Sequence, residues 1–510
     1  MTTHDVEIAI IGAGFSGVGA AIKLAQNGVD DFVILDRGAD FGGTWRDNTY
    51  PGAACDVASN LYSYSFAPNP EWSRSYSHQP EIHRYINKVA DEYGVRERAR
   101  FHTEVTQARW DEDTAHWIVD TVHDGVENTY RAQHLIGAVG PLCEPNLPDI
   151  DGIESFGGTI MHSARWDDSV EVTGKRVAVI GTGASAIQIV PELATRASHL
   201  DVYQRTAPWI VPRTERPYTP VEHWAFRNIP AIQTASRAGI YTFNEFIAFG
   251  MTYSPVALKP VEILARANIF RGIRDRKLRA KVTPTFQIGC KRILRSNTWY
   301  PTLDRENVDL ITSPIERITE TGIVTADGTA HDVDILVVAT GFHVTDSPVF
   351  NNIAGVGGRS LAQVWAEIGM QGYKGAFVHG FPNLMLMIGP STGLGHTSMV
   401  YMIESQLNYL VDYIKTARSR QATRIEVTMN AQRRYNNGIQ HKLRNSVWVN
   451  GGCASWYKDA NGNITTLWPG FTFDFRRETK KFDVAAYDIT RAASSEPASL
   501  SPVTSAGVGA

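Results

Sequence analysis

The sequence is short of three things: cysteine, long apolar runs and net charge. Its four cysteines, Cys55, Cys143, Cys290 and Cys453, are widely spaced and form neither a CxxC pair nor a dense disulfide framework, so we expect reduced thiols and a cytoplasmic protein. No basic and apolar leader precedes Val6, and no run of about 18 apolar residues occurs, so we expect neither secretion nor a membrane span. With 49 Lys and Arg against 53 Asp and Glu, the net charge of −4 does not indicate a nucleic-acid partner.

The composition that remains is that of an ordinary globular protein. Hydrophobic residues make up 43% and charged residues 20% of the 510 residues. At about 100–200 residues per domain, this length predicts two to four domains, and a soluble enzyme is the default expectation. We predict no metal site, and the sequence does not indicate an oligomeric state.

A glycine-rich turn lies near the start of the chain. The apolar run 6–11 precedes GAGFSG at residues 12–17 and then a segment with helical periodicity at 18–26, a pattern of strand, tight turn and helix. Gly12 allows the sharp turn, Gly14 lets the backbone approach a pyrophosphate, and Gly17 lets helix and strand pack closely. A second strand at 32–35 ends in Asp36, at the spacing of a carboxylate that binds ribose hydroxyls. The pattern predicts dinucleotide binding, with an ordinary glycine-rich turn as the alternative.

The next loop, residues 42–56, is dense in glycine and aromatic residues. Such a loop can wrap a flat ring system. Its last residue, Asp56, would need a cationic partner or hydrogen bonds to stay ionised in an apolar setting. From the residues alone, a surface aspartate is an equal alternative.

A second glycine-rich turn, GTGASA at residues 181–186, follows the strand 176–180 and precedes the helix 187–194. The following strand, 200–203, ends in Gln204-Arg205-Thr206 and offers no acid for a ribose hydroxyl. An arginine with a hydroxyl suits the extra 2′-phosphate of NADPH, although a surface arginine is the alternative. Two such turns in one chain predict two dinucleotides.

The other segments organise the chain around these turns. Lys291 and Arg292 are adjacent cations in an apolar extended segment, so their side chains point opposite ways and can serve different anions; a solvated pair is the alternative. The turn at 389–396 precedes a helix whose amides could also face a cofactor. We further predict a helix at 80–93, a hairpin and return strand at 117–122 and 135–139, a connector at 140–148, a helical region at 212–281, strands at 308–311, 322–325, 334–338 and 384–388, a helix at 398–416, and a flexible tail at 491–510.

Two long motifs resemble those of one enzyme family. Residues 156–167 match the fingerprint FxGxxxHxxxW followed by Pro or Asp, through Phe156, Gly158, His162, Trp166 and Asp167. The loop at 42–56 matches a second family pattern through Gly43, Trp45, Tyr50, Pro51, Gly52 and Asp56. The chain therefore resembles the class B flavoprotein monooxygenases and, among them, the type I Baeyer–Villiger monooxygenases, over about residues 6–473. Flavin-containing enzymes that oxygenate nitrogen and sulfur carry Tyr where this chain has Trp166.

The resemblance implies an α/β fold with two Rossmann-like dinucleotide-binding domains and a helical insertion. It implies a discontinuous FAD domain at 1–147 and 345–490, an NADP domain at 148–212 and 281–344, and the insertion at 213–280. The FAD residues implied are Gly12, Gly14, Phe15, Ser16, Gly17, Asp36, Arg37, Thr44, Trp45, Asp56, Tyr62, Val105 and Met399. The NADP residues implied are Gly181, Thr182, Gly183, Ser185, Gln188, Arg205, Thr206, Lys291, Arg292 and Trp456.

It also implies the reaction. NADPH reduces the flavin, O2 forms a C4a-peroxyflavin, and one oxygen is inserted next to a ketone carbonyl to give an ester or lactone, with sulfoxidation of thioethers as a side activity. Arg292 matches the catalytic arginine and Asp56 the acid that orients it. Trp456 matches a tryptophan that covers NADP+, which is retained during turnover. The position of residues 156–167 predicts a linker, with His162 and Trp166 in a hinge and not in catalysis.

Alternatives remain at this point. A heteroatom monooxygenase forming N- or S-oxides would use the same cofactors, and a flavin redox sensor would not oxygenate at all. A disulfide reductase is disfavoured because no paired cysteines follow the first turn. The turn GPSTGLGH at 389–396 differs from the best-known cycloketone enzymes, so the physiological ketone or thioether is not predicted.

Overall fold

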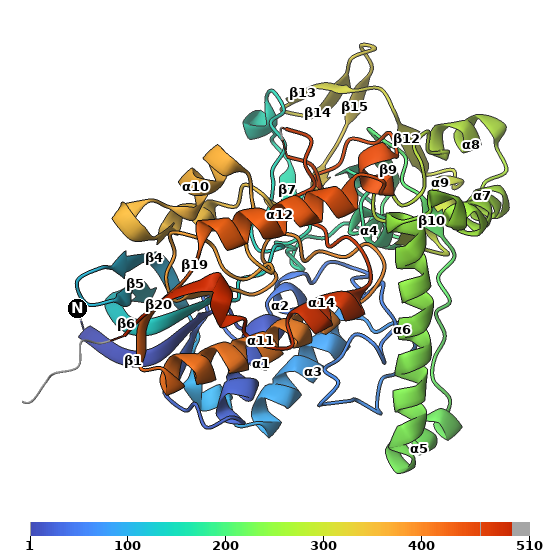
Figure 1. Cartoon of the computed structure of the whole chain (residues 1–510). Coiled ribbons are helices and arrows are strands. Elements are labelled where there is room, and N and C mark those ends of the chain that lie inside the picture. Colours follow the sequence, from blue (N-terminus) through green and yellow to red (C-terminus); the bar gives the residue numbers. More distant parts are fainter. Residues whose placement is uncertain (1, 460, 492–510) are drawn as a thin grey trace, which may run out of the picture.

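The computed structural model describes residues 2–459 and 461–491. The predicted flexible tail lies outside these residues, except for Arg491, which ends a strand. Figure 1 shows one sheet at the left with helices beside it, a second sheet in the upper part below a small sheet at the top, and a long upright helix toward the right. None of the described helices is long and apolar enough to cross a membrane.

The first sheet is built around the strand that precedes the first glycine-rich turn. Its order is β17-β4-β5-β6-β1-β2-β3, with β18 also paired to β6. β1 pairs in parallel with both β2 and β6, whereas β4, β5 and β6 form an antiparallel meander. The bounds are β1 Thr2–Ile11, β2 Phe32–Leu35, β3 Ala99–Arg100, β4 Thr103–Asp111, β5 His116–His123, β6 Val126–Gly137, β17 Ile353–Ala354 and β18 Leu384–Leu386. The predicted strand at 32–35 is confirmed residue for residue, and β1 begins earlier than expected.

Three helices cover one face of this sheet: α1 (Phe15–Ala25), α3 (Gln79–Glu92) and α11 (Met399–Ser419). α1 packs against α11, and their buried residues share one core with the sheet. The C-terminal part of the chain thus returns to complete the N-terminal sheet. The remaining helices of the chain outside the insertion are α2 Thr44–Asp47, α4 Ala186–Leu193, α9 Trp299–Leu303, α10 Leu361–Ile368, α12 Met429–Leu443, α13 Val447–Asn450 and α14 Thr472–Glu478.

The second sheet is parallel throughout, in the order β12-β9-β8-β16-β7. Its strands are β7 Thr159–His162, β8 Arg176–Ile180, β9 His199–Tyr203, β12 Val308–Ile311 and β16 Ile335–Val338. The expectation that residues 156–167 form only a linker is therefore wrong in part: four of them form β7, because their backbone pairs with β16 at the sheet edge. The other strands are β13 Ile315–Thr319, β14 Gly322–Thr325 and β15 Ala330–Asp332, which form a small antiparallel sheet, and the pair β19 Ala422–Val427 and β20 Tyr487–Arg491.

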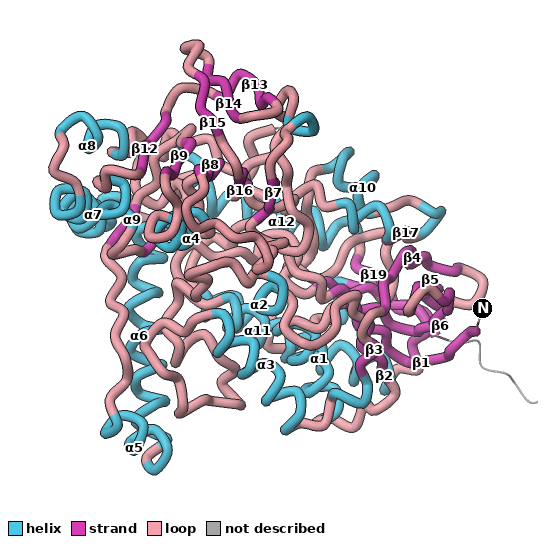
Figure 2. The backbone as a smooth tube through the Cα atoms, turned by 180° about the vertical axis from the view of Figure 1, so that it is seen from behind, coloured by secondary structure: helices cyan, strands magenta, loops and turns pink. Residues whose placement is uncertain are grey.

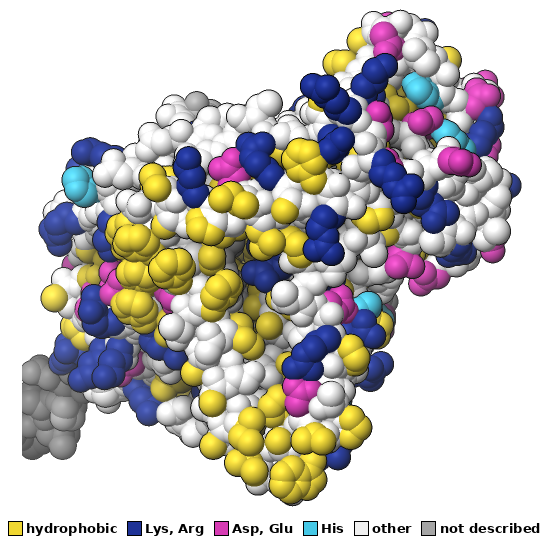
Figure 3. Space-filling view, turned by 90° about the vertical axis from the view of Figure 1, so that its right-hand side faces the viewer, with side chains coloured by type: hydrophobic (Ala, Val, Ile, Leu, Met, Phe, Trp, Pro, Cys, Tyr) yellow, Lys and Arg dark blue, Asp and Glu magenta, His cyan; other side chains and the backbone are white. Residues whose placement is uncertain are grey.

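The helical insertion leaves the second sheet and returns to it through the short parallel pair β10 (Ile210–Val211) and β11 (Leu294–Arg295). It contains α5 Pro220–Asn228, α6 Pro230–Thr252, α7 Lys259–Gly272 and α8 Arg276–Val282, which confirms the predicted helical character. Figure 3 faces this side of the molecule, with hydrophobic side chains at the lower end and mixed charges at the upper end. Short 3₁₀ helices complete the chain: η1 Arg96–Arg98, η2 Ile153–Ser155, η3 Pro255–Leu258, η4 Pro348–Asn352, η5 Val356–Gly358 and η6 Val484–Ala486.

Two antiparallel segments connect the halves that contain the two sheets. The amide of Asn146 donates to the carbonyl of Gly341, and the amide of His343 donates to the carbonyl of Glu144, each at 2.9 Å. Seen from behind, the sheets stand apart with loops between them (Figure 2).

The cysteines correct one expectation. Cys290 and Cys453 form a disulfide, so the prediction of reduced thiols throughout is wrong; Cys55 and Cys143 are free. The two residues are 163 positions apart, and folding brings the segment before β11 next to the loop after α13. Local spacing carries no signal for such a pair.

Candidate cofactor and active site

The first glycine-rich turn has the geometry of a phosphate cradle. Gly12 has φ of +108°, and a Cβ there would lie 2.6 Å from the carbonyl oxygen of Ala138, so only glycine fits. A Cβ on Gly17 would collide with the carbonyl of Gly12. α1 begins at Phe15 without a side-chain cap, which leaves its first amides, including that of Ser16, free for a phosphate.

Asp36 lies buried at the end of β2, where it meets this turn. Its Oδ2 accepts the amide of Ala13 at 2.7 Å, and its Oδ1 accepts both the amide of Gly38 and Nη1 of Arg46 at 2.7 Å. A carboxylate offers about four lone-pair positions, so one remains for a ribose hydroxyl. Arg46 was missed from the sequence because no spacing rule links it to Asp36.

Trp45, from the loop at 42–56, forms an aromatic wall together with Tyr62 and Phe15. Trp45 Nε1 donates to the hydroxyl of Tyr62 at 2.9 Å, and the ring of Tyr62 meets that of Phe15 edge-on at 5.4 Å between centroids. Burial raises the pKa of Tyr62, so its hydroxyl stays protonated. These flat surfaces next to the cradle fit a flavin. Of the other predicted FAD residues, Gly14 caps α1, Thr44 begins α2, Met399 begins α11, Val105 lies on β4, and Arg37 pairs with Glu144 at 2.7 Å.

The second turn begins, like the first, with a glycine of positive φ. Gly181 has φ of +120°, and a Cβ there would lie 2.5 Å from the carbonyl oxygen of Ala339. A Cβ at Gly183 would meet nothing within 4 Å, so the turn opens to solvent. α4 follows Ser185 without a side-chain cap, and Thr182 Oγ1 donates to the carbonyl of Thr206 at 3.1 Å. The amides of this turn are thus free for a second pyrophosphate.

Arg205 and Lys291 are close enough to interact electrostatically, and among the described residues neither forms an ion pair with a carboxylate. The pKa of Lys291 is lowered by burial and by the positive charge of Arg205. Like charges held side by side favour an anionic ligand such as a phosphate. Gln188 serves a different contact: its Oε1 accepts the hydroxyl of Tyr50 at 3.0 Å, and its Nε2 donates to the carbonyl of Ala54 at 3.0 Å. It therefore joins α4 to the loop of the first half.

An arginine and an aspartate meet between the two turns. Arg292 Nε donates to Asp56 Oδ2 at 2.9 Å and Nη2 donates to Oδ1 at 2.8 Å, a bidentate pair. Burial opposes ionisation of Asp56, but Arg292, with Arg295 and Arg213, outweighs it and lowers the pKa of the carboxyl. The Asp56 charge raises the pKa of Arg292, which stays protonated. Lys291 does not share this partner: its Nζ lies 5.3 Å from the ring centroid of Phe286. The segment 288–291 forms a turn and not the extended chain expected, and β11 begins only at Leu294.

Tyr457 was not predicted but lies beside this pair. It is buried, and both burial and the charge of Asp56 raise its pKa, while Arg292 lowers it. Its neighbour Trp456 is 54% exposed and meets it edge-on at 4.4 Å. Sequence reasoning chose Trp456 and passed over Tyr457 because the resemblance carried no role for it.

The fingerprint histidine lies at the junction of the two halves. His162 is buried; its Nε2 donates to the carbonyl of Gly341 and its Nδ1 accepts the amide of Ala164, each at 3.1 Å. Burial lowers its pKa, which favours the neutral ring. Trp166 is half-buried and packs against the core of the second half.

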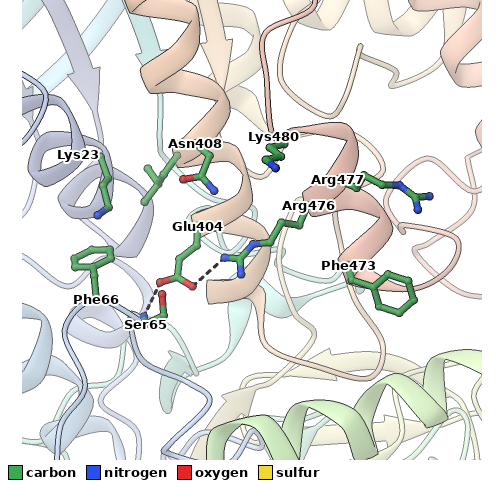
Figure 4. A pocket seen from close by; sticks show the side chains of 10 residues that line it. Lys23, Ser65, Phe66, Glu404, Asn408, Phe473, Arg476, Arg477 and Lys480 are labelled. Carbon is green, nitrogen blue, oxygen red and sulfur yellow. Dashed lines mark hydrogen bonds and ion pairs between the residues drawn. The ribbon is translucent and has the colours of Figure 1, made fainter. Parts of the chain in front are cut away.

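Two further features lie elsewhere. A cavity of about 610 Å³ between α1, α11 and α14 shares no lining residue with the predicted site; in it Glu404 accepts the amide of Ser65 and pairs with Arg476 (Figure 4). The ligand atoms of His199, Asp201 and Asp309 lie within 4.8 Å of one another at the edge of the second sheet, although no metal site was predicted. Neither belongs to the arginine–aspartate centre.

Comparisons with known proteins agree with this geometry. Residues 5–229 match the family described as flavin-binding monooxygenase-like. The chain is 45% identical over 491 residues to a Baeyer–Villiger monooxygenase of Streptomyces coelicolor, covering 96% of this chain and 94% of that protein. A Baeyer–Villiger monooxygenase of Pseudomonas aeruginosa is 46% identical, covering 95% and 91%. The crystal structure of cyclohexanone monooxygenase from Rhodococcus sp. Phi1 bound to NADP+ has a TM-score of 0.84 at 28% identity, covering 96% of this chain and 100% of that one.

Fold, site and matches define a flavin monooxygenase that uses FAD, NADPH and O2. The two glycine turns belong to the two Rossmann-like domains of this α/β fold. Within that class, the chain belongs to the Baeyer–Villiger monooxygenase family.

Proposed function

We propose that this enzyme inserts oxygen next to the carbonyl of a small ketone, with Arg292 as the catalytic cation. The observation that carries the proposal is the bidentate Asp56–Arg292 pair between the two dinucleotide turns. A guanidinium keeps its charge at any working pH, so it can stabilise negative charge that develops on the substrate oxygen. Asp56 holds the guanidinium plane in one orientation, which preorganises that donor.

The cofactor supplies the oxidising chemistry: bound FAD, once reduced by NADPH, activates O2. The chain's own residues bind and orient. Gly12, Gly14 and the amides of α1 would hold the FAD pyrophosphate, Asp36 the ribose, and Trp45 with Tyr62 the ring system. At the second turn, Gly181 and Gly183 would hold the NADP pyrophosphate.

The extra phosphate of NADPH would lie between Arg205, Thr206 and Lys291. The support is that Arg205 lowers the pKa of Lys291 while, among the described residues, neither cation pairs with a carboxylate; a phosphate there would relieve their repulsion. Trp456 would then close over the nicotinamide and limit water access to the flavin. Retention of NADP+ through turnover follows from this closure.

His162 and Trp166 would act at the hinge between the two domains. The support is that the carbonyl of Gly341, on one connecting segment, accepts from the amide of Asn146 on the other and from Nε2 of His162 at the end of β7. A neutral histidine fixed by two hydrogen bonds is suited to transmit domain movement and not to carry protons. We infer an FAD domain at 1–147 and 345–490, an NADP domain at 148–212 and 281–344 and an insertion at 213–280, in a cytoplasmic protein.

The test begins with a visible spectrum of the purified protein, followed by product analysis with a panel of ketones and one thioether under NADPH and O2. We expect a flavin spectrum, esters or lactones from at least one ketone, and a sulfoxide as a minor product. A sulfoxide or N-oxide with no ester from any ketone would assign the enzyme to heteroatom oxygenation. Slow NADPH oxidation with hydrogen peroxide as the sole product would remove oxygenation altogether.

A further inference from the structure

The disulfide joins two segments that the proposed mechanism uses separately. Cys290 directly precedes Lys291 and Arg292, while Cys453 lies three residues before Trp456. Three residues of extended chain span at most about 11 Å, so the crosslink confines Trp456 to the neighbourhood of the catalytic segment. Cys290 is fully buried and Cys453 nearly so.

The stretch 452–456 has few other attachments. One residue before it, the carbonyl of Gly451 accepts the amide of Gln287 at 2.9 Å, and one residue after it, the carbonyl of Tyr457 accepts the amide of Thr465 at 3.3 Å. Within the part of the chain that the structure describes, residues 452–456 make no hydrogen bond to another segment. Between these two anchors, the Cys453 side chain is the covalent tie.

We propose that the Cys290–Cys453 disulfide is a positioning crosslink that holds the Trp456 loop against the segment of Lys291 and Arg292 and so raises the affinity for NADP+. This rests on the proposed roles of those residues in NADP binding. The physical reason is preorganisation: a loop that is already confined has less conformational freedom to lose when it closes over a ligand. Opening the bond releases the middle of the loop while both anchors remain.

Reduction provides the matched comparison. A water-soluble phosphine breaks the S–S bond, each sulfur gains a proton to become a thiol, and the phosphine takes up the oxygen of water to become its oxide. The reduced protein differs from the oxidised one only by the two added hydrogens, so no residue is substituted and any change comes from opening the bond. Cys55 and Cys143 are already free and are not altered by this step.

The experiment compares the oxidised wild type, the phosphine-reduced wild type and the double variant Cys290→Ser/Cys453→Ser, with Cys143→Ser as a control. Mass spectrometry of alkylated peptides first establishes whether Cys290 and Cys453 are joined by a disulfide in each sample. We then measure amide hydrogen exchange of 451–459 and NADP+ binding from the change in flavin absorbance. Reduced wild type and double variant are expected to bind NADP+ about tenfold more weakly and to exchange faster in this loop; Cys143→Ser should match the oxidised wild type.

Three results would overturn the proposal. They are two free thiols at these positions in freshly purified protein, unchanged NADP+ affinity and exchange after reduction, and a double variant that still responds to the phosphine. None of these readouts needs a ketone substrate. A protein that makes no ester but loses NADP+ affinity on reduction would therefore refute the proposed reaction and keep the crosslink, whereas ester formation with unchanged affinity would do the reverse.

Discussion

The two dinucleotide turns have similar backbone conformations, but the residues that follow the next strand carry opposite charges. Gly12 and Gly181 both have positive φ, and each faces the carbonyl of a residue just after a return strand, Ala138 or Ala339. The helices that follow both begin without a side-chain cap. After the second strand, however, the first half has the buried carboxylate of Asp36 and the second has exposed Arg205.

The difference separates two tasks of a dinucleotide site. Free amides at a helix N-terminus accept any pyrophosphate, so this part is common to both halves. The charge at the end of the second strand chooses between a ribose hydroxyl and a 2′-phosphate. On the proposed assignment, the first half would bind FAD and the second NADPH, and the adjacent residues Lys291 and Arg292 would contribute to the second site and to the centre.

The largest loss of activity should come from substituting the first glycine of each turn, one turn at a time. In Gly12→Ala the new Cβ meets the Ala138 carbonyl, so we expect purified protein without flavin and without activity. In Gly181→Ala the same clash arises in the second half, so we expect bound flavin with NADPH oxidation reduced at least a hundredfold. Flavin content by absorbance and NADPH consumption test this, and circular dichroism checks that both variants fold. Equal flavin loss in both variants would contradict the assignment of FAD to the first half and NADPH to the second.

Removal of the central cation should come next. Arg292→Ala should lower ester formation by about 10²–10³-fold, as expected for loss of one preorganised donor, while the flavin is still reduced by NADPH. Arg292→Lys keeps the charge but loses the bidentate contact to Asp56, and should recover part of the activity. Stopped-flow reduction and product analysis separate the two steps. An ester yield near wild type in Arg292→Ala would refute the catalytic role.

The comparison is sharpened by a smaller change in the second half. Arg205→Ala should raise the KM for NADPH by about 10–100-fold, the value of a charge-assisted hydrogen bond, and leave that for NADH almost unchanged. Steady-state kinetics with both nucleotides measure this. The matched control is Arg37→Ala, after the second strand of the first half, which should not alter the NADPH to NADH ratio. Equal increases for both nucleotides in Arg205→Ala would remove the 2′-phosphate assignment.

The smallest effect concerns pH. Because the pKa of Asp56 is lower in the folded protein, its ionised form stabilises the fold above the ordinary carboxyl pKa of about 3.9, and this contribution is lost as the pH falls through the lower folded value. Asp56→Asn should therefore be less stable than wild type at pH 7, and the difference should shrink toward pH 3. Urea denaturation at several pH values measures it. A constant difference would mean that the ion pair is not its source.

The local pattern of apolar residues in the sequence predicted the strands that are buried and regular. The strands at 32–35, 176–180 and 308–311 agree with β2, β8 and β12 residue for residue, because each is a short apolar run that ends at a turn. β4 was not predicted, since exposed polar residues interrupt its buried ones. β7 was taken for linker because its strand character depends on pairing with β16.

The same limit applies to the site. Asp36 follows a strand at a known spacing, and Asp56 and Arg292 were found through family motifs. The contact of Arg46 with Asp36 depends on the short helix α2, which turns Arg46 back toward β2. The Cys290–Cys453 pair was missed because two separate loops must fold before their sulfurs meet.

By itself, the sequence determined where the chain turns sharply: glycine at Gly12 and Gly181 is a local steric requirement. Tertiary structure decided which charges meet. Asp56 and Arg292 are 236 positions apart, and the charge of Arg205 acts on Lys291, 86 positions later, across the insertion whose two ends pair as β10 and β11. Backbone geometry is set within a few residues, whereas electrostatic and covalent contacts depend on distance in space, which only the folded chain defines.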